Sequence, residues 1–260
     1  MDVLTPRSLS EALALREAHP EALPIQGGTD VMVGLNFDRA RPAALLNLNE
    51  VAELREWAPT ADGYRIGAGV TYAEVMSGPL AAEFPALAEA SRTVGSPQIR
   101  NRGTIGGNLA TASPAGDSIP PLVVGGAEVE CTSLHGTRRV PVAEFVTGVK
   151  RNALAADELI TAIHLRPSGG PETFLKVGPR NAMVIAVCSL AVSAGDELRA
   201  AFGSAAPRPV LVTAPRGDAA SFPAKVAAAA TPIDDVRGSA AYRRHAIEVL
   251  TRRALERCLA

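Results

Sequence analysis

Two glycine-containing segments, far apart in the sequence, carry the residue types best suited to hold an anion. They are Pro24–Asp30 (PIQGGTD) and Asn101–Asn108 (NRGTIGGN). A glycine has no Cβ, so its main chain can approach a ligand closely and take a positive φ. Successive N–H groups can then converge on one anion. Two such segments suit a ligand with two phosphates, which indicates a dinucleotide.

Neither segment is a nucleotide fingerprint by itself. The first lacks the spacing of G-x-G-x-x-G, and neither contains G-x-x-x-x-G-K-[ST]. A single Gly-Gly pair is more often a plain turn. The interpretation therefore requires that the two segments fold together around one ligand.

The elements around these segments are predicted from caps and periodicity. Ser8 and Glu11 have the spacing of a capping box, and His19-Pro20 ends the helix that they begin. A short strand at 24–26 leads into the first segment, and a helix beginning at Val31 would aim its dipole at an anion there. Further helices are expected at 84–94, 119–124 and 239–259, and strands at 44–48, 64–70, 127–131 and 183–192.

The stretch 167–171 (PSGGP) is the best candidate for a linker, because proline and glycine interrupt regular structure. The closing helix carries an apolar stripe typical of core packing, made of Tyr242, Ala246, Ile247, Leu250, Ala254 and Cys258.

Composition excludes several classes of function. The chain has 260 residues, a formal net charge of −1 and only 4% aromatic residues, which does not fit a nucleic-acid-binding protein. Its three cysteines are far apart, which argues against a zinc or iron–sulfur site within this chain. The cysteine usage and the absence of a leader-like segment fit a cytoplasmic protein without a membrane span.

No nucleophile–base pair is visible in the sequence. The four histidines are scattered, without metal-ligand spacing, so no catalytic or metal-ligating residue is assigned. The roles that these residues can fill are to bind and tune a cofactor, which would itself be the reactive group.

The two segments together resemble the FAD-binding (medium) subunits of molybdenum hydroxylases, the xanthine and carbon monoxide dehydrogenase family. The first is similar to that family's A-G-G-T-D loop. The second, continued to Asp117, is similar to its T-I-G-G-N…A-S-P-x-x-D signature. Further similar blocks follow in family order at 174–180, 203–207 and 234–244, so the resemblance covers nearly the whole chain.

The resemblance implies an α+β fold. Residues 1–167 would form a PCMH-type FAD-binding domain with subdomains at about 1–58 and 59–167. Residues 172–260 would form a sheet-and-helix domain like the C-terminal domain of carbon monoxide dehydrogenase flavoproteins. The chain is short between Ala205 and Asp234 compared with longer relatives, which leaves open any loop that covers the cofactor there.

The predicted FAD-binding residues follow from both arguments. Main-chain N–H groups of the glycines would hold the pyrophosphate, threonine hydroxyls would assist, and Asn108 would anchor the polar part of the cofactor. The resemblance adds the first segment, Ile160 and a lysine beside the flavin. The full set is Pro24, Ile25, Gln26, Gly27, Gly28, Thr29, Asp30, Val31, Thr104, Ile105, Gly106, Gly107, Asn108, Ala110, Thr111, Asp117, Ile160 and Lys176.

Local alternatives remain for four of these residues. Asp117 either accepts from ribityl or ribose hydroxyls or caps the helix at 119–124. Asn108 either anchors the ligand or closes its own turn, and Asp30 either contacts the ligand or caps the helix at Val31. Lys176, taken without the resemblance, is a surface lysine.

The implied function is electron transfer. Electrons would pass from [2Fe–2S] clusters in a small partner subunit through FAD to NAD⁺ or another acceptor. A large molybdopterin subunit would hold the molybdenum cofactor and oxidise the substrate. The segments 96–102 and 203–207 look most like xanthine dehydrogenase-type members. The alternatives are a stand-alone FAD oxidoreductase of the vanillyl-alcohol-oxidase-like class and a non-catalytic partner subunit.

Overall fold

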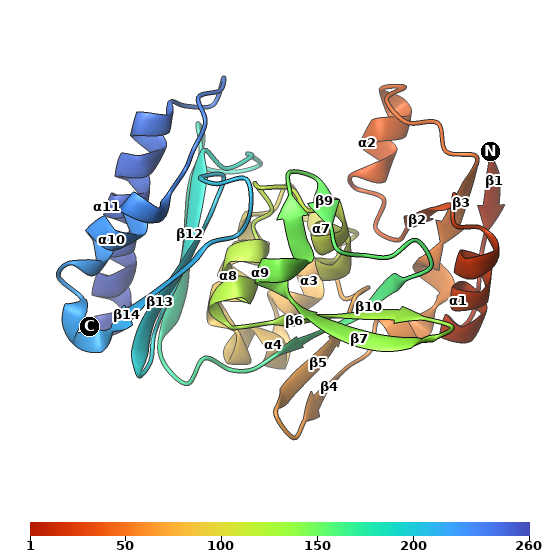
Figure 1. Cartoon of the computed structure of the whole chain (residues 1–260), viewed down its shortest axis with the longest axis horizontal. Helices are drawn as coiled ribbons and strands as arrows, with labels where there is room; N and C mark the ends of the chain where they lie inside the picture. Colours follow the sequence, from red (N-terminus) through yellow and green to blue (C-terminus); the bar gives the residue numbers. More distant parts are fainter.

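The computed structural model describes all 260 residues and arranges them in three parts along the longest axis (Figure 1). The N-terminal part is a three-stranded parallel sheet with strand order β1-β3-β2 and two helices. Its elements are β1 (Asp2–Leu4), α1 (Leu9–Ala18), β2 (Leu23–Ile25), α2 (Val31–Asn36) and β3 (Ala44–Asn47), followed by 3-10 turns at Leu48–Glu50 and Ala52–Leu54.

Local sequence signals explain where α1 begins. The Ser8 hydroxyl accepts a hydrogen bond from the Glu11 N–H at 3.2 Å, and the Glu11 carboxylate accepts from the Arg7 N–H at 2.8 Å. The predicted cap is therefore confirmed, with the return bond going to Arg7 rather than to Ser8. Ala12 and Leu13 of this helix are buried against Leu46 of the sheet.

The central part is a five-stranded antiparallel sheet with order β4-β5-β10-β6-β7, covered on one face by helices (Figure 1). In β6, Val129 and Cys131 are buried while Glu128 and Glu130 on the other face are half-buried, as the period of a strand requires. The elements are β4 (Trp57–Thr60), β5 (Gly63–Gly67), α3 (Tyr72–Val75), α4 (Gly78–Glu83), α5 (Pro85–Thr93), α6 (Pro97–Arg100), α7 (Ile105–Thr111), α8 (Ile119–Val124), β6 (Glu128–Ser133), β7 (Gly136–Pro141), α9 (Val142–Phe145), β8 (Val146–Gly148), β9 (Arg151–Asn152) and β10 (Leu159–Leu165).

The C-terminal part is a four-stranded antiparallel sheet, in chain order, with helices on both faces. Its own helices α10 and α11 cover one face, and α5 and α8 of the central part cover the other. Every residue of β12 is buried, because the strand lies between these two layers. The elements are β11 (Glu172–Val177), β12 (Cys188–Ala194), β13 (Glu197–Gly203), β14 (Leu211–Pro215), a 3-10 turn (Arg216–Asp218), α10 (Phe222–Ala229) and α11 (Ala240–Leu259).

The central and C-terminal parts share one apolar core. Phe174 of β11 and Ala191 of β12 belong to the same buried cluster as Ile163 of β10. The stretch 167–171 connects β10 to β11, as expected of a linker, but the parts that it joins are packed closely together. The division into domains 1–167 and 172–260, with subdomains at about 1–58 and 59–167, stays a prediction.

Two sequence predictions for the C-terminal part need correction. The strand expected at 183–192 begins only at Cys188, because Met183 takes a positive φ of 50° that no strand contains. In the closing helix, Tyr242 is 49% exposed and Arg243 is only 2% exposed. The helix bounds themselves are confirmed, with Ser239 as the N-cap.

Arg243 is buried because it joins two loops to α11. One Nη donates to the Ser204 carbonyl at 2.7 Å, and the other donates to the Asp235 carboxylate. A sequence pattern that counts only apolar residues cannot find such a position, because the burial follows from partners on distant segments.

We expect Arg243→Met to lower the free energy of unfolding by about 2 kcal/mol, because the buried Ser204 carbonyl loses its donor. Arg244→Met is the matched control on the exposed side of the same helix, and it should change stability by less than about 0.5 kcal/mol. Urea unfolding followed by circular dichroism measures both. Equal effects of the two substitutions would contradict the assignment.

Candidate functional site

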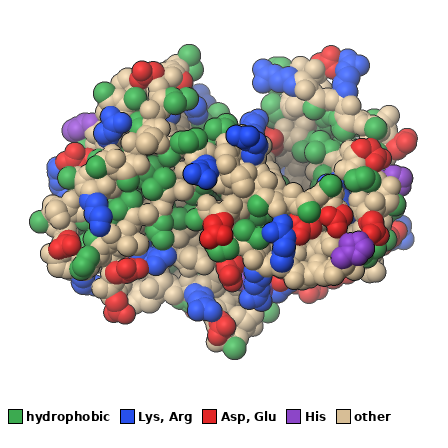
Figure 2. All heavy atoms as spheres, viewed as in Figure 1, with side chains coloured by type: hydrophobic (Ala, Val, Ile, Leu, Met, Phe, Trp, Pro, Cys, Tyr) green, Lys and Arg blue, Asp and Glu red, His purple; other side chains and the backbone are tan.

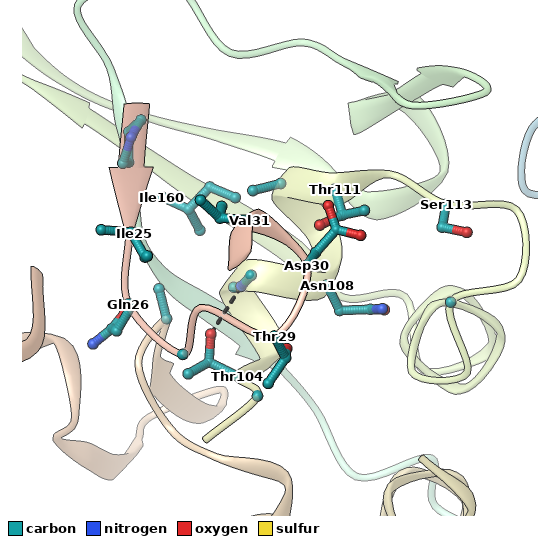
Figure 3. Close-up of a pocket in the computed structure, with 18 of the residues that line it drawn as sticks. Ile25, Gln26, Thr29, Asp30, Val31, Thr104, Asn108, Thr111, Ser113 and Ile160 are labelled. Atoms are coloured by element: carbon teal, nitrogen blue, oxygen red, sulfur yellow. Dashed lines mark hydrogen bonds between the residues drawn. The ribbon is translucent and has the colours of Figure 1, made fainter. Parts of the chain in front are cut away.

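The two glycine-containing segments meet in one cleft. It has a volume of 760 Å³, within the range of small-molecule sites, and it is lined from all three parts of the chain. Figure 2 shows the molecule hollowed between the part that carries α2 and the central part. Figure 3 shows Thr29 of the first segment close to Thr104 of the second. The geometric condition for a shared ligand site is therefore met.

The closest approach of the two segments explains the first glycine. A Cβ on Gly27 would lie 2.1 Å from the Arg102 carbonyl oxygen, a separation that no side chain permits. The Arg102 guanidinium also donates to Asn49 Oδ1 of the N-terminal part at 2.9 Å. Gly28 adopts a φ of +73°, which only glycine takes without strain. The glycine pair thus allows both the contact and the turn after β2.

The first segment presents an open row of donors. None of the main-chain N–H groups from Gly27 to Val31 makes a hydrogen bond within the protein, although all five residues line the cleft. The Asp30 side chain makes no capping bond to α2, so the capping alternative is wrong for this residue. Unpaired N–H groups facing a cleft need an acceptor, and an anion is the strongest one.

The second segment differs from the prediction. Residues 105–111 form α7 rather than a loop, with the Thr104 hydroxyl accepting from the Gly107 N–H at 2.9 Å. The Gly106 N–H donates to the Ala68 carbonyl at 2.9 Å. The prediction that these two glycines supply N–H donors to a ligand is therefore wrong, because helix capping and packing already use both groups.

The glycines of α7 serve close packing and access instead. A Cβ on Gly106 would come within 2.6 Å of Ala68, so this glycine lets α7 pack against the strand end. A Cβ on Gly107 would meet only the Thr104 hydroxyl, at 2.9 Å, and Gly107 is exposed in the cleft. Gly107 thus leaves space for a ligand, and a side chain at this position must also displace the Thr104 hydroxyl that caps α7.

Asn108 lies within α7, so the alternative that it closes its own turn is wrong. Its Oδ1 accepts from the Ser118 hydroxyl at 2.6 Å, and its amide nitrogen has no partner in the protein. Figure 3 shows the Asn108 side chain extending from α7. The contact with Ser118 fixes the amide so that its NH₂ group can donate to a ligand in the cleft.

Asp117 is buried and does not cap α8, whose N-cap is Ser118. Its Oδ2 accepts from Lys176 Nζ at 2.5 Å and from the Thr93 hydroxyl at 3.3 Å. Its Oδ1 is buried without a partner, and the residue lines the cleft. A free carboxylate oxygen in that position can accept a hydrogen bond from a ligand hydroxyl. The ligand role of Asp117 therefore stays a prediction.

Lys176 is 7% exposed and is not a surface lysine. It lies behind Asp117 and does not line the cleft, because the ion pair and a 3.2 Å bond to the Thr93 carbonyl hold its ammonium. Burial raises the pKa of the Asp117 carboxyl, and the adjacent ammonium opposes that rise. Burial also raises the pKa of Tyr72, which lines the cleft beside this pair.

The cleft contains most of the predicted residues. Of the predicted set, only Ile105 and Lys176 do not line it; Ile105 is turned into the core. Sequence reasoning missed lining residues whose signal is purely tertiary; among them are Arg16, Leu23, Leu48, Ala68, Tyr72, Asn152, Glu158, Leu159, Val184 and Ile185. No residue beyond Ile185 lines the cleft, so the stretch between Ala205 and Asp234 contributes no residue to it.

Comparison with known proteins decides the family. Residues 1–167 match the family model described as FAD binding domain in molybdopterin dehydrogenase. The chain belongs to this family. It is an FAD-binding flavoprotein subunit of the molybdenum hydroxylase oxidoreductases, as the sequence predicted.

Individual relatives match over almost their whole length. The putative xanthine dehydrogenase FAD-binding subunit of Escherichia coli (strain K12) is 31% identical over 97% of this chain and 94% of that protein. The carbon monoxide dehydrogenase medium chain of Afipia carboxidovorans is 31% identical over 100% and 96%. A structure of the Cu,Mo-CO dehydrogenase in its cyanide-inactivated form superposes with a TM-score of 0.91 at 28% identity, covering 99% of this chain and 97% of that one. The α+β fold prediction is confirmed. No helix has both the length and the apolar character needed to cross a membrane.

The cleft fits FAD on its own chemistry. The unpaired N–H groups of Gly27–Val31 are suited to a pyrophosphate, and the unpartnered Oδ1 of Asp117 is suited to a hydroxyl. The apolar side chains of Ile25 and Ile160, which also line the cleft, are suited to an aromatic ring.

The ion pair beneath the cleft gives a test of its electrostatics. We expect Lys176→Met to lower the free energy of unfolding by about 3 kcal/mol at pH 8, since it leaves a buried carboxylate unpaired. The pKa of Asp117 then rises further, so the folded protein binds a proton that the unfolded protein does not. The loss should therefore shrink as the pH falls toward 5.

Two further variants complete that measurement. The double variant Lys176→Met/Asp117→Asn should be more stable than Lys176→Met at pH 8 and should lack the pH dependence. Lys225→Met removes an exposed lysine and should change little. A pH-independent loss in Lys176→Met, measured by urea unfolding, would show that Asp117 is not charged in the folded protein.

Proposed function

We propose that the chain is the electron-transfer subunit of a xanthine dehydrogenase-like complex (EC 1.17-type). When bound, FAD accepts electrons from the [2Fe–2S] clusters of a small partner subunit and passes them to NAD⁺ or another acceptor. A large molybdopterin subunit carries the molybdenum cofactor and oxidises the substrate. The single observation that supports this proposal is the cleft in which the two family segments come together. The relatives named xanthine dehydrogenase FAD-binding subunit agree with it.

Each group of residues in the cleft has a proposed role. The N–H groups of residues 27–31 bind the pyrophosphate, and the hydroxyls of Thr29 and Thr111 add donors. The Asn108 NH₂ group orients the polar chain of the cofactor, and Asp117 accepts from one of its hydroxyls. Lys176 acts through Asp117 by keeping that carboxylate charged and fixed.

The chain itself supplies binding, orientation and shielding from water. No side chain in the cleft is assigned a proton-transfer step, which agrees with a subunit whose reactive group is its cofactor. The complex is proposed to be heteromeric and cytoplasmic, with no contact to nucleic acid.

Cofactor binding is tested by one substitution in the cleft. The wild-type protein should bind FAD and then show the flavin absorption band at about 450 nm. We expect Gly107→Val to weaken FAD binding at least about tenfold, because the new side chain enters the cleft. A smaller loss of thermal stability is also expected, because the Cβ must displace the Thr104 hydroxyl that caps α7. Gly217→Val, at a surface glycine with open space around it, is the control. Failure of the wild type to take up FAD would sink the proposal.

Dependence on partners is tested with the loaded protein. Under anaerobic conditions, xanthine should not bleach the flavin of the isolated chain. It should bleach the flavin when the molybdenum and iron–sulfur subunits that co-purify with the chain are present. Bleaching of the isolated chain would instead support the stand-alone oxidoreductase, and its absence in the complex would exclude xanthine as substrate.

A further inference from the structure

The N-terminal part of the chain contributes one region of the cleft lining. Leu48 and Leu159 belong to the apolar core of the N-terminal part, whereas Tyr72 and Ile160 belong to the central core. In Figure 3, Ile25 and Ser113 lie on opposite sides of the cleft, with Thr29 between them. Leu23 and Pro24 precede Ile25 on β2, and Arg16 is held beside them by its bond to the Ala22 carbonyl. Leu48 and Leu159 of the N-terminal core line the cleft as well.

Arg16 is the only arginine or lysine that lines the cleft. It lies in α1 and is half-buried, and one of its Nη groups donates to the Pro20 and Ala22 carbonyls at 3.2 and 2.8 Å. This anchor fixes the guanidinium beside the start of β2. Its Nε is buried and has no partner within the protein. A fixed guanidinium with an unused buried donor is placed to bind an acceptor from outside the chain.

The surroundings of Arg16 favour a flat ring over a phosphate. Leu23, Leu48 and Leu159 give this part of the cleft apolar walls. Under the proposed function, the phosphate-binding role belongs to the N–H groups of residues 27–31, which have no partner within the protein. An aromatic base has an apolar face that can pack against the leucines. It also has ring nitrogens that can accept a hydrogen bond from the Arg16 guanidinium.

We propose that Arg16 is a specificity residue that recognises the adenine of FAD and makes the site prefer the dinucleotide to FMN. This inference rests on the proposed function, because it assumes that FAD occupies the cleft. The guanidinium contacts the base from the side of α1, and the leucines enclose it. The preference for FAD over FMN then depends on a residue outside both glycine-containing segments.

The test compares two flavins. We expect Arg16→Met to raise the Kd for FAD at least about tenfold and to leave the Kd for FMN within about twofold, because FMN has no adenine. ADP, which carries adenine without flavin, should compete with FAD in the wild type and lose this ability in the variant. Titration of flavin fluorescence measures all three values without any catalytic assay.

Arg216→Met is the matched control. Arg216 likewise donates one Nη to two main-chain carbonyls, those of Ala194 and Gly195, but it does not line the cleft. The control variant should keep the wild-type affinities for FAD, FMN and ADP. A drop in FAD affinity in the control equal to that in Arg16→Met would show that loss of an anchoring arginine alone causes the effect, which overturns the inference.

A second variant guards against unfolding. Arg16→Lys keeps a charge that can reach the Ala22 carbonyl but loses the planar guanidinium, so it should still weaken FAD selectively. If both variants lost affinity for FAD and FMN equally, Arg16 would only stabilise the turn at 20–22. That result would overturn the inference. Failure of the wild type to bind either flavin would instead refute the proposed function.

Discussion

The structure depends on the contact between the main chain of Gly27 and the carbonyl of Arg102. These residues come from different parts of the chain, and no side chain fits between them. The contact brings β2 and its open row of N–H groups against the start of α7. Because a backbone-to-backbone approach is rigid and short, the position of the donors relative to Asn108 is set by the fold rather than by flexible side chains.

The cleft is supported on its other side by a buried ion pair. Asp117 follows α7 in the sequence, and Lys176 lies on β11, so their contact joins the central and C-terminal parts. A buried pair adds little net stability because desolvation offsets attraction. The pair instead holds the Asp117 carboxylate in place, with one of its oxygens left without a partner at the edge of the cleft. The C-terminal part thus contributes to the site mainly by holding a residue of the central part in place.

Local signals in the sequence predicted local structure well. Ser8 caps α1 where the pattern indicated, and the closing helix begins after Ser239 as expected. Predictions failed where distant segments compete for the same atoms. The Gly106 N–H donates to the carbonyl of Ala68, which is far away in the sequence, so it is not free to bind a ligand.

The sequence by itself determined the family, the cofactor class and 16 of the 36 residues that line the cleft, because the two glycine-containing segments carry a recognisable spacing of glycine and threonine. Only the tertiary structure decided what each residue does there. Lys176 pairs with Asp117, although the two residues are far apart in the chain. Arg16 likewise lines the cleft together with residues that are distant from it in the sequence. Such contacts depend on how whole elements pack, and no periodicity or motif within one segment records that packing.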